Sequence, residues 1–107
     1  MRVFLEMDVS GRDIVMRIRE VVSSICSGDL VTGVFSVFKV LQTEEDEEKL
    51  FRALLILEHL IQKNVMSSNK LHGLFAKVSD KLKKFVSNRI ADKAEKISLI
   101  LTELKNN

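Results

Sequence analysis

The amino-acid sequence predicts an all-α protein, a compact bundle of about five helices joined by short loops. Three observations favour this fold class. The 107 residues include no proline and only four glycines, so residues that break helices or form β-hairpin turns are scarce. Hydrophobic residues make up 46% of the chain and recur at the helical spacing of three or four positions. Short polar segments divide the chain into five such stretches, which fit in one domain.

A first helix is expected over about residues 12–24. Ser10 followed by Asp13 resembles a capping box in which Asp replaces the usual Glu. The preceding residues follow no clear pattern, so residues 1–12 are assigned to an N-terminal arm and residues 13–104 to a helical protein-interaction domain.

A second helix is expected over about residues 30–42. The segment Ser27-Gly28-Asp29 interrupts the apolar pattern before it and supplies residues that favour a helix start. At 100° per residue, the apolar side chains of this helix cover about 220° of its circumference. They are Leu30, Val31, Val34, Phe35, Val37, Phe38, Val40 and Leu41.

A third helix is expected over about residues 44–63. Thr43 can cap it, and the acidic run 44–48 would then lie near the positive end of the helix dipole. The acidic run could also suggest a cation site, but it lacks the alternating oxygen ligands and turn glycine of a calcium loop. Apolar residues lie almost all round this helix, which predicts a central position in the bundle.

The last two helices are expected over about residues 68–85 and 88–104. The serine pair 67–68 can cap the fourth helix, and either residue of the pair 87–88 can cap the fifth. The inner face of the fifth helix is predicted to consist of Ile90, Ala94, Ile97, Leu101 and Leu104.

The sequence argues against an enzyme, a metal site and a cofactor. His59 and His72 are 13 residues apart, outside the usual short spacings of metal ligands, and each is interpreted as a surface histidine. Cys26 has no evident activating base, is expected to begin a loop, and fits a reducing intracellular compartment. Gly28 and Gly33 lack the lysine of a phosphate-binding loop. No secretory signal and no membrane-spanning run of about 18 apolar residues is expected.

Charge is divided unevenly along the chain. Residues 1–64 carry 8 basic and 11 acidic side chains, whereas residues 65–107 carry 9 basic and 4 acidic ones. In the fourth helix, one row within about 60° holds Lys70, Lys77, Lys81 and Lys84. Three interpretations stay open for this row: an ordinary solvated face, a nucleic-acid contact, or a surface for an acidic peptide. The absence of interleaved aromatic residues and the net charge of +2 argue against nucleic acid.

A shared pattern runs through the last three expected helices: the leucine-rich segment 54–60, then Val78 and Leu82-Lys83-Lys84, then Ile90, Ala94, Ile97 and Leu101. This pattern resembles the TFIIS N-terminal domain family. This family includes domains of TFIIS, Elongin A, a Mediator subunit and the Spn/Iws elongation factors, as well as the integrase-binding domain of the lens-epithelium-derived growth factor. The layout is most similar to the Spn/Iws type, although Leu101 stands where the family usually has Trp.

The resemblance implies a nuclear, non-enzymatic module of the RNA polymerase II transcription elongation machinery. Such a module would bind short acidic segments that contain Phe, and the implied partner is a histone chaperone of the Spt class. No small-molecule substrate, nucleic acid or membrane is expected as a partner. Two interhelical loops at one end of the bundle would form the site, with the binding residues Ile25, Cys26, Lys81, Lys84, Phe85, Val86 and Arg89.

One alternative stays open beside this interpretation. A stand-alone helical bundle that acts through homo-oligomerisation, or as a viral or bacterial regulator, would show the same helical pattern. A dimer that buries the fourth helix would favour that alternative.

Overall fold

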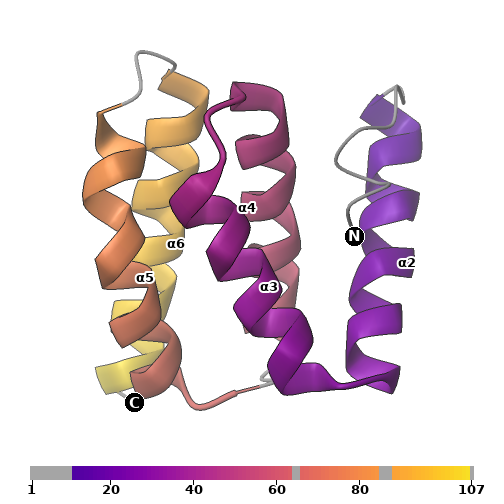
Figure 1. Cartoon of the computed structure of the whole chain (residues 1–107). Helices are drawn as coiled ribbons and strands as arrows, with labels where there is room; N and C mark the ends of the chain where they lie inside the picture. Colours follow the sequence, from indigo (N-terminus) through magenta and orange to yellow (C-terminus); the bar gives the residue numbers. More distant parts are fainter. Residues whose placement is uncertain (1–10, 64–65, 85–87, 107) are drawn as a thin grey trace.

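The computed structural model describes residues 11–63, 66–84 and 88–106. These residues form an all-α bundle in which each helix runs opposite to the one before it (Figure 1). The predicted fold class and all five predicted helices are therefore confirmed. The helices are α2 (Gly11–Ser27), α3 (Leu30–Thr43), α4 (Glu47–Gln62), α5 (Ser68–Lys83) and α6 (Asn88–Asn106).

Side-chain caps fix where three of the helices begin. Asp29 accepts hydrogen bonds from the backbone nitrogen of Thr32 (3.2 Å) and from its hydroxyl (2.7 Å). The hydroxyl donor is the main reason why the pKa of Asp29 is lowered. Ser67, the first of the two predicted serines, caps α5 by accepting a hydrogen bond from the nitrogen of Lys70.

The start of α4 differs from the sequence prediction. Thr43 does not cap α4 but ends α3, where its hydroxyl bonds back to the carbonyl oxygen of Lys39 (2.9 Å). Asp46 is the cap instead and accepts from the nitrogen of Lys49 (3.0 Å). Asp46 lies three positions after Thr43 and competes well for this role, since either side chain can accept a hydrogen bond from a backbone nitrogen two or three residues further on.

Helix α4 is the central helix, as its wide apolar surface predicts. It packs against α2, α3 and α6, while α5 packs against α3 and α6. Apolar residues on most sides of α4 are fully buried. They are Leu50, Ala53, Leu54, Ile56, Leu57, Leu60 and Ile61.

Two close contacts join neighbouring helices of the bundle, one between α2 and α3 and the other between α4 and α6. Gly33 of α3 lets Ile25 of α2 approach so closely that a Cβ at position 33 would lie 2.6 Å from the Cγ2 of Ile25. On the other side, the buried Glu58 of α4 pairs with Lys93 (3.4 Å) and Lys96 (3.6 Å) of α6. Four of the five residues predicted for the inner face of α6 are fully buried, and Leu104 is half-buried.

Candidate protein-binding surfaces

The first predicted binding residues lie at the end of the bundle where α2 meets α3. Ile25 is half-buried and packs against the core, so little of its side chain is offered to a ligand. Cys26 is exposed, but it lies in the last turn of α2 and not in a loop, because the helix extends to Ser27.

Lys84 and Arg89, two further predicted binding residues, lie at the opposite end of the bundle. Lys84 is the exposed C-cap of α5, and Arg89 lies in the first turn of α6. Three antiparallel helices separate the α2–α3 connection from the α5–α6 connection, which places the two at opposite ends (Figure 1). The structure therefore does not bring Ile25 and Cys26 together with Lys84 and Arg89, and the expectation of one site at one end is corrected. Phe85 and Val86 lie outside the described residues.

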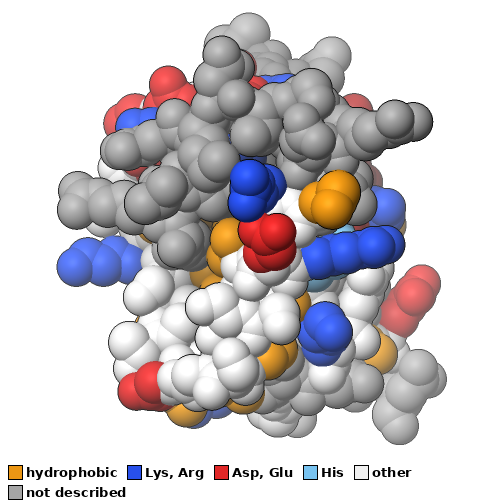
Figure 2. All heavy atoms as spheres, turned by 90° about the vertical axis from the view of Figure 1, so that its right-hand side faces the viewer, with side chains coloured by type: hydrophobic (Ala, Val, Ile, Leu, Met, Phe, Trp, Pro, Cys, Tyr) orange, Lys and Arg blue, Asp and Glu red, His pale blue; other side chains and the backbone are white. Residues whose placement is uncertain are grey.

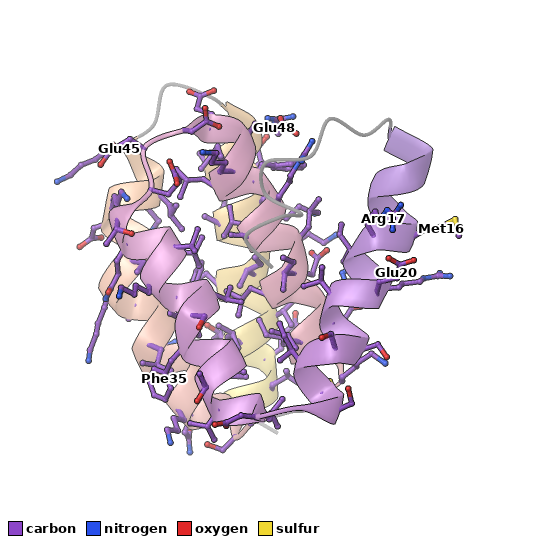
Figure 3. The ribbon with its side chains drawn as sticks, turned by 45° about the vertical axis from the view of Figure 1, so that its right-hand side comes forward. Met16, Arg17, Glu20, Phe35, Glu45 and Glu48 are labelled. Carbon is purple, nitrogen blue, oxygen red and sulfur yellow. The ribbon has the colours of Figure 1, made fainter. Side chains whose placement is uncertain are left out.

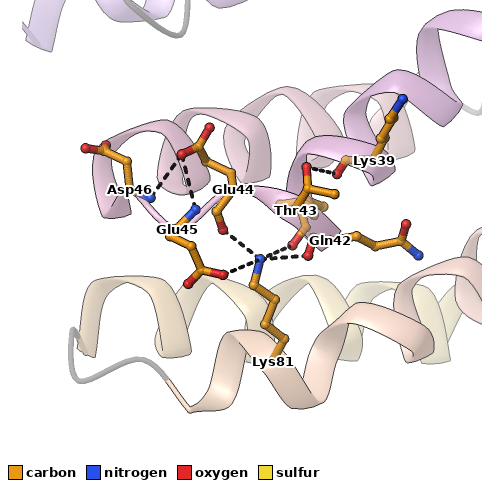
Figure 4. A network of polar contacts seen from close by, with 8 residues as sticks. Lys39, Gln42, Thr43, Glu44, Glu45, Asp46 and Lys81 are labelled. Carbon is orange, nitrogen blue, oxygen red and sulfur yellow. Dashed lines mark hydrogen bonds and ion pairs between the residues drawn. The ribbon is translucent and has the colours of Figure 1, made fainter.

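Lys81 forms hydrogen bonds within the molecule. Its ammonium group donates to the carbonyl oxygens of Leu41 (3.2 Å), Gln42 (2.9 Å) and Glu44 (2.6 Å), as Figure 4 shows. The Glu45 carboxylate lies 3.9 Å away. A lysine has three N–H donors, and here all three satisfy carbonyls around the negative C-terminal end of α3. This geometry gives Lys81 a structural role that joins α5 to the end of α3.

Arg89 also has partners within the molecule. Its guanidinium bonds to the carboxylate of Glu48 (2.9 Å) and lies 4.2 Å from the ring centroid of Phe51. Glu48 also accepts from Arg52 (3.2 Å). The pKa of Glu48 is lowered, first by the hydrogen bond from Arg89 and then by the charges of both arginines. This cluster joins the start of α6 to the first turns of α4.

A different surface combines exposed apolar and basic side chains. On α3, Val31 and Phe35 are 52% and 42% exposed, and they lie four residues apart on one flank of the helix. Lys70 of α5 places its ammonium nitrogen 5.9 Å from the centroid of the Phe35 ring. Figure 3 shows Phe35 on the ribbon of α3. We define the α3–α5 face as Val31, Phe35, Lys39, Lys70, Leu74 and Lys77.

The sequence did not single out Phe35, although it contained a signal. Phe35 was one residue of an apolar set that covers about 220° of the second predicted helix. Only four residues of α3 are fully buried: Val34, Val37, Phe38 and Leu41. An apolar arc wider than a core-facing stripe, on a helix that is not central, indicates apolar side chains left at the surface.

The other exposed apolar residues do not gather in this way. Met16 of α2 is 61% exposed and Leu99 of α6 is 59% exposed. On the side of the molecule where α2 lies, the side chains that are not grey show apolar groups as small separate spots among charges of both signs (Figure 2). Scattered exposed apolar residues of this kind are normal for a protein surface.

A metal-binding cluster and a membrane-spanning helix are both absent from the described ranges. No group of three or more His, Cys, Asp or Glu side chains there is placed to hold a metal ion. His59 is half-buried, contrary to the prediction of a surface residue, and its Nδ1 lies 2.9 Å from the carbonyl oxygen of Leu55. None of the helices in the described part has the length and hydropathy needed to cross a bilayer.

Comparison of the chain with protein-family models, curated proteins and solved structures gives no significant match.

Proposed function

We propose that the chain is a non-enzymatic protein-interaction module that binds an acidic segment with apolar side chains. One observation carries this proposal. Val31 and Phe35 are exposed on α3, and Lys70 of α5 lies beside Phe35. Within the two helices the only acidic residue is Asp80, and Asp29 precedes α3 as its cap. Exposed apolar groups supply affinity when a partner covers them, and a surface with more lysines than acidic residues favours acidic partners over basic ones.

The proposed setting is RNA polymerase II transcription elongation in the nucleus, with a histone chaperone of the Spt class as partner. This part of the proposal rests on the sequence resemblance to the TFIIS N-terminal domain family. The support comes from the leucine-rich segment 54–60, which lies in the second half of α4, and from the spacing of Ile90, Ala94, Ile97 and Leu101 in α6.

Binding of an acidic segment can be tested by fluorescence anisotropy with three labelled synthetic peptides. The first contains several Asp and Glu residues around one Phe. The second replaces the acids with Asn and Gln, and the third replaces the Phe with Ser. We expect only the first to bind well, with an affinity that falls as salt is added, because the charges involved are exposed. Equal binding of all three, or binding of none, would contradict the proposal.

The transcription setting needs a separate experiment. The tagged chain is recovered from its own cells and the bound proteins are identified by mass spectrometry. We expect an Spt-class chaperone whose acidic segment competes with the labelled acidic peptide. Recovery of a second copy of the chain alone would favour the homo-oligomer and remove the support for a transcription role.

A further inference from the structure

We propose that the α3–α5 face binds a single acidic amphipathic helix of a partner protein. The inference rests on the proposed function, since it assigns the acidic ligand a place and a conformation. It moves the binding site away from the helix connections and onto the flank shared by two helices.

The charge of this face supports an acidic occupant. Between Leu30 and Thr43, α3 contains no acidic residue, and the only acidic residue of α5 is Asp80. The two helices together contain five lysines, of which Lys81 is occupied by the carbonyls at the end of α3. Lys39 and Lys77 are exposed, and within the described part of the chain neither ammonium group is paired with a carboxylate. A segment with carboxylates on one side would pair with these cations.

The direction of the two helices supports a helical occupant. Both α3 and α5 begin at the same end of the bundle, so their side-chain rows run in parallel (Figure 1). Lys70 and Lys77 are seven residues apart, which is two helical turns or about 10.5 Å along α5. A partner helix laid along this face would therefore present acidic residues seven apart, with apolar residues between them facing Phe35. Apolar and charged anchors at such spacings are typical of a helix bound on a helical surface.

The two kinds of side chain would contribute differently to binding. Neighbouring residues already cover part of Phe35, and a partner would cover the 42% of this residue that is exposed. Aromatic anchors that become buried carry much of the affinity of an interface. Exposed lysines act mostly on the association rate and on its salt dependence. Substitution of Phe35 should therefore weaken binding more than substitution of Lys77.

The test uses a designed probe and NMR of the full chain. The probe is a synthetic peptide with Glu residues seven apart and a Phe between them on the same helical face. A second peptide has the same composition in an order that separates the Glu and Phe residues on the helix. Amide chemical-shift mapping with the probe is expected to move signals of Val31, Phe35, Lys70 and Lys77. The circular dichroism of the probe should show more helix when bound.

Matched variants distinguish a loss of binding at the α3–α5 face from an effect that any similar substitution would have. Phe35→Ala should weaken binding of the probe about tenfold, whereas Leu99→Ala, at another exposed apolar position, should leave it unchanged. Lys77→Gln should weaken binding about threefold, mainly through slower association. Lys83→Gln removes the same charge from the opposite flank of α5 and should have little effect. Unchanged urea midpoints would show that each variant is folded.

The outcomes distinguish this inference from the proposed function. Binding of the probe with shifts confined to Lys84 and Arg89, or equal binding of both peptides, would overturn the inference and keep the acidic-segment function. No binding of either acidic peptide would overturn both. A dimer that buries Phe35, detected by light scattering and NMR, would assign the face to a second copy and overturn the inference. Tighter binding of a single-stranded RNA oligonucleotide to the same face would overturn it too.

Discussion

The charged groups of Lys81 and Arg89 both bind partners within the folded molecule. Lys81 donates to three carbonyls at the end of α3, and Arg89 pairs with Glu48 while its guanidinium lies over Phe51. In the sequence analysis, both belonged to the binding residues that the family resemblance implied, and Lys81 also belonged to the basic row of the fourth helix. A wheel describes one helix only and does not show which helix end or carboxylate lies opposite. At the residue scale, one lysine of the predicted basic row, Lys81, therefore binds carbonyls inside the molecule instead of facing a ligand.

Glu48→Gln is predicted to lower stability in a pH-dependent way. The pKa of Glu48 is lowered in the folded state, so its contribution is complete above the unfolded value of about 4.5 and is lost as the pH falls through the folded value. The side chain is 46% exposed, and partly exposed ion pairs contribute about 0.5 kcal/mol. We expect a loss of that size at pH 7, which disappears at pH values well below 4.5, in urea unfolding followed by circular dichroism.

Glu47→Gln is the matched control for Glu48→Gln. Both residues lie in the first turn of α4 and interact similarly with its dipole, but only Glu48 meets Arg89 and Arg52. A loss at pH 7 that is equal in the two variants would mean that the helix dipole, and not the arginines, lowers the pKa of Glu48.

At the element scale, the five helices could be predicted because local signals agree with the fold. Caps, the helical period of the apolar residues and the absence of proline all indicate the same segments, and the observed ends differ by a few residues at most. The main error concerns Thr43 and Asp46, which are both good caps and lie three residues apart. Which of them caps α4 depends on how far α3 extends, and α3 is extended to Thr43 by packing and by Lys81.

Gly33→Ala and Gly73→Ala are predicted to change stability in opposite directions. A Cβ at position 33 would lie 2.6 Å from the Cγ2 and 3.3 Å from the Cβ of Ile25, so the Ile25 side chain or α2 would have to move. This crowding should cost about 1–3 kcal/mol, more than the gain of about 1 kcal/mol in helix propensity. At position 73 nothing lies within 4 Å, so Ala should stabilise α5 by about 0.5–1 kcal/mol.

Urea midpoints of the two glycine variants measure this difference. Each variant adds the same methyl group to a helix interior, so the difference between them reports the contact of α3 with α2. Equal stabilisation in both variants would show that Ile25 and Gly33 are not in close contact in solution.

At the scale of the whole molecule, connectivity decides which residues meet. The resemblance implied a site built from the connections after α2 and after α5, but three helices of similar length lie between them. In an antiparallel bundle an odd number of intervening helices places two connections at opposite ends (Figure 1). Counting helices in the sequence could have shown this. The α3–α5 face could not be found by counting, because it depends on which non-consecutive helices become neighbours, and that is a result of packing.

Leu57→Ala is predicted to destabilise the whole bundle. Leu57 is fully buried in α4, which packs against α2, α3 and α6. The cavity should cost about 2–5 kcal/mol, a large share of the roughly 5–15 kcal/mol that stabilises a typical domain. Leu99→Ala removes the same atoms at a position that is 59% exposed and should change stability by less than about 0.5 kcal/mol. Because α4 contacts three helices, amide exchange in Leu57→Ala should accelerate in α2, α3 and α6 together. Faster exchange in α4 alone would mean that the helices are not coupled through the centre and unfold as separate units.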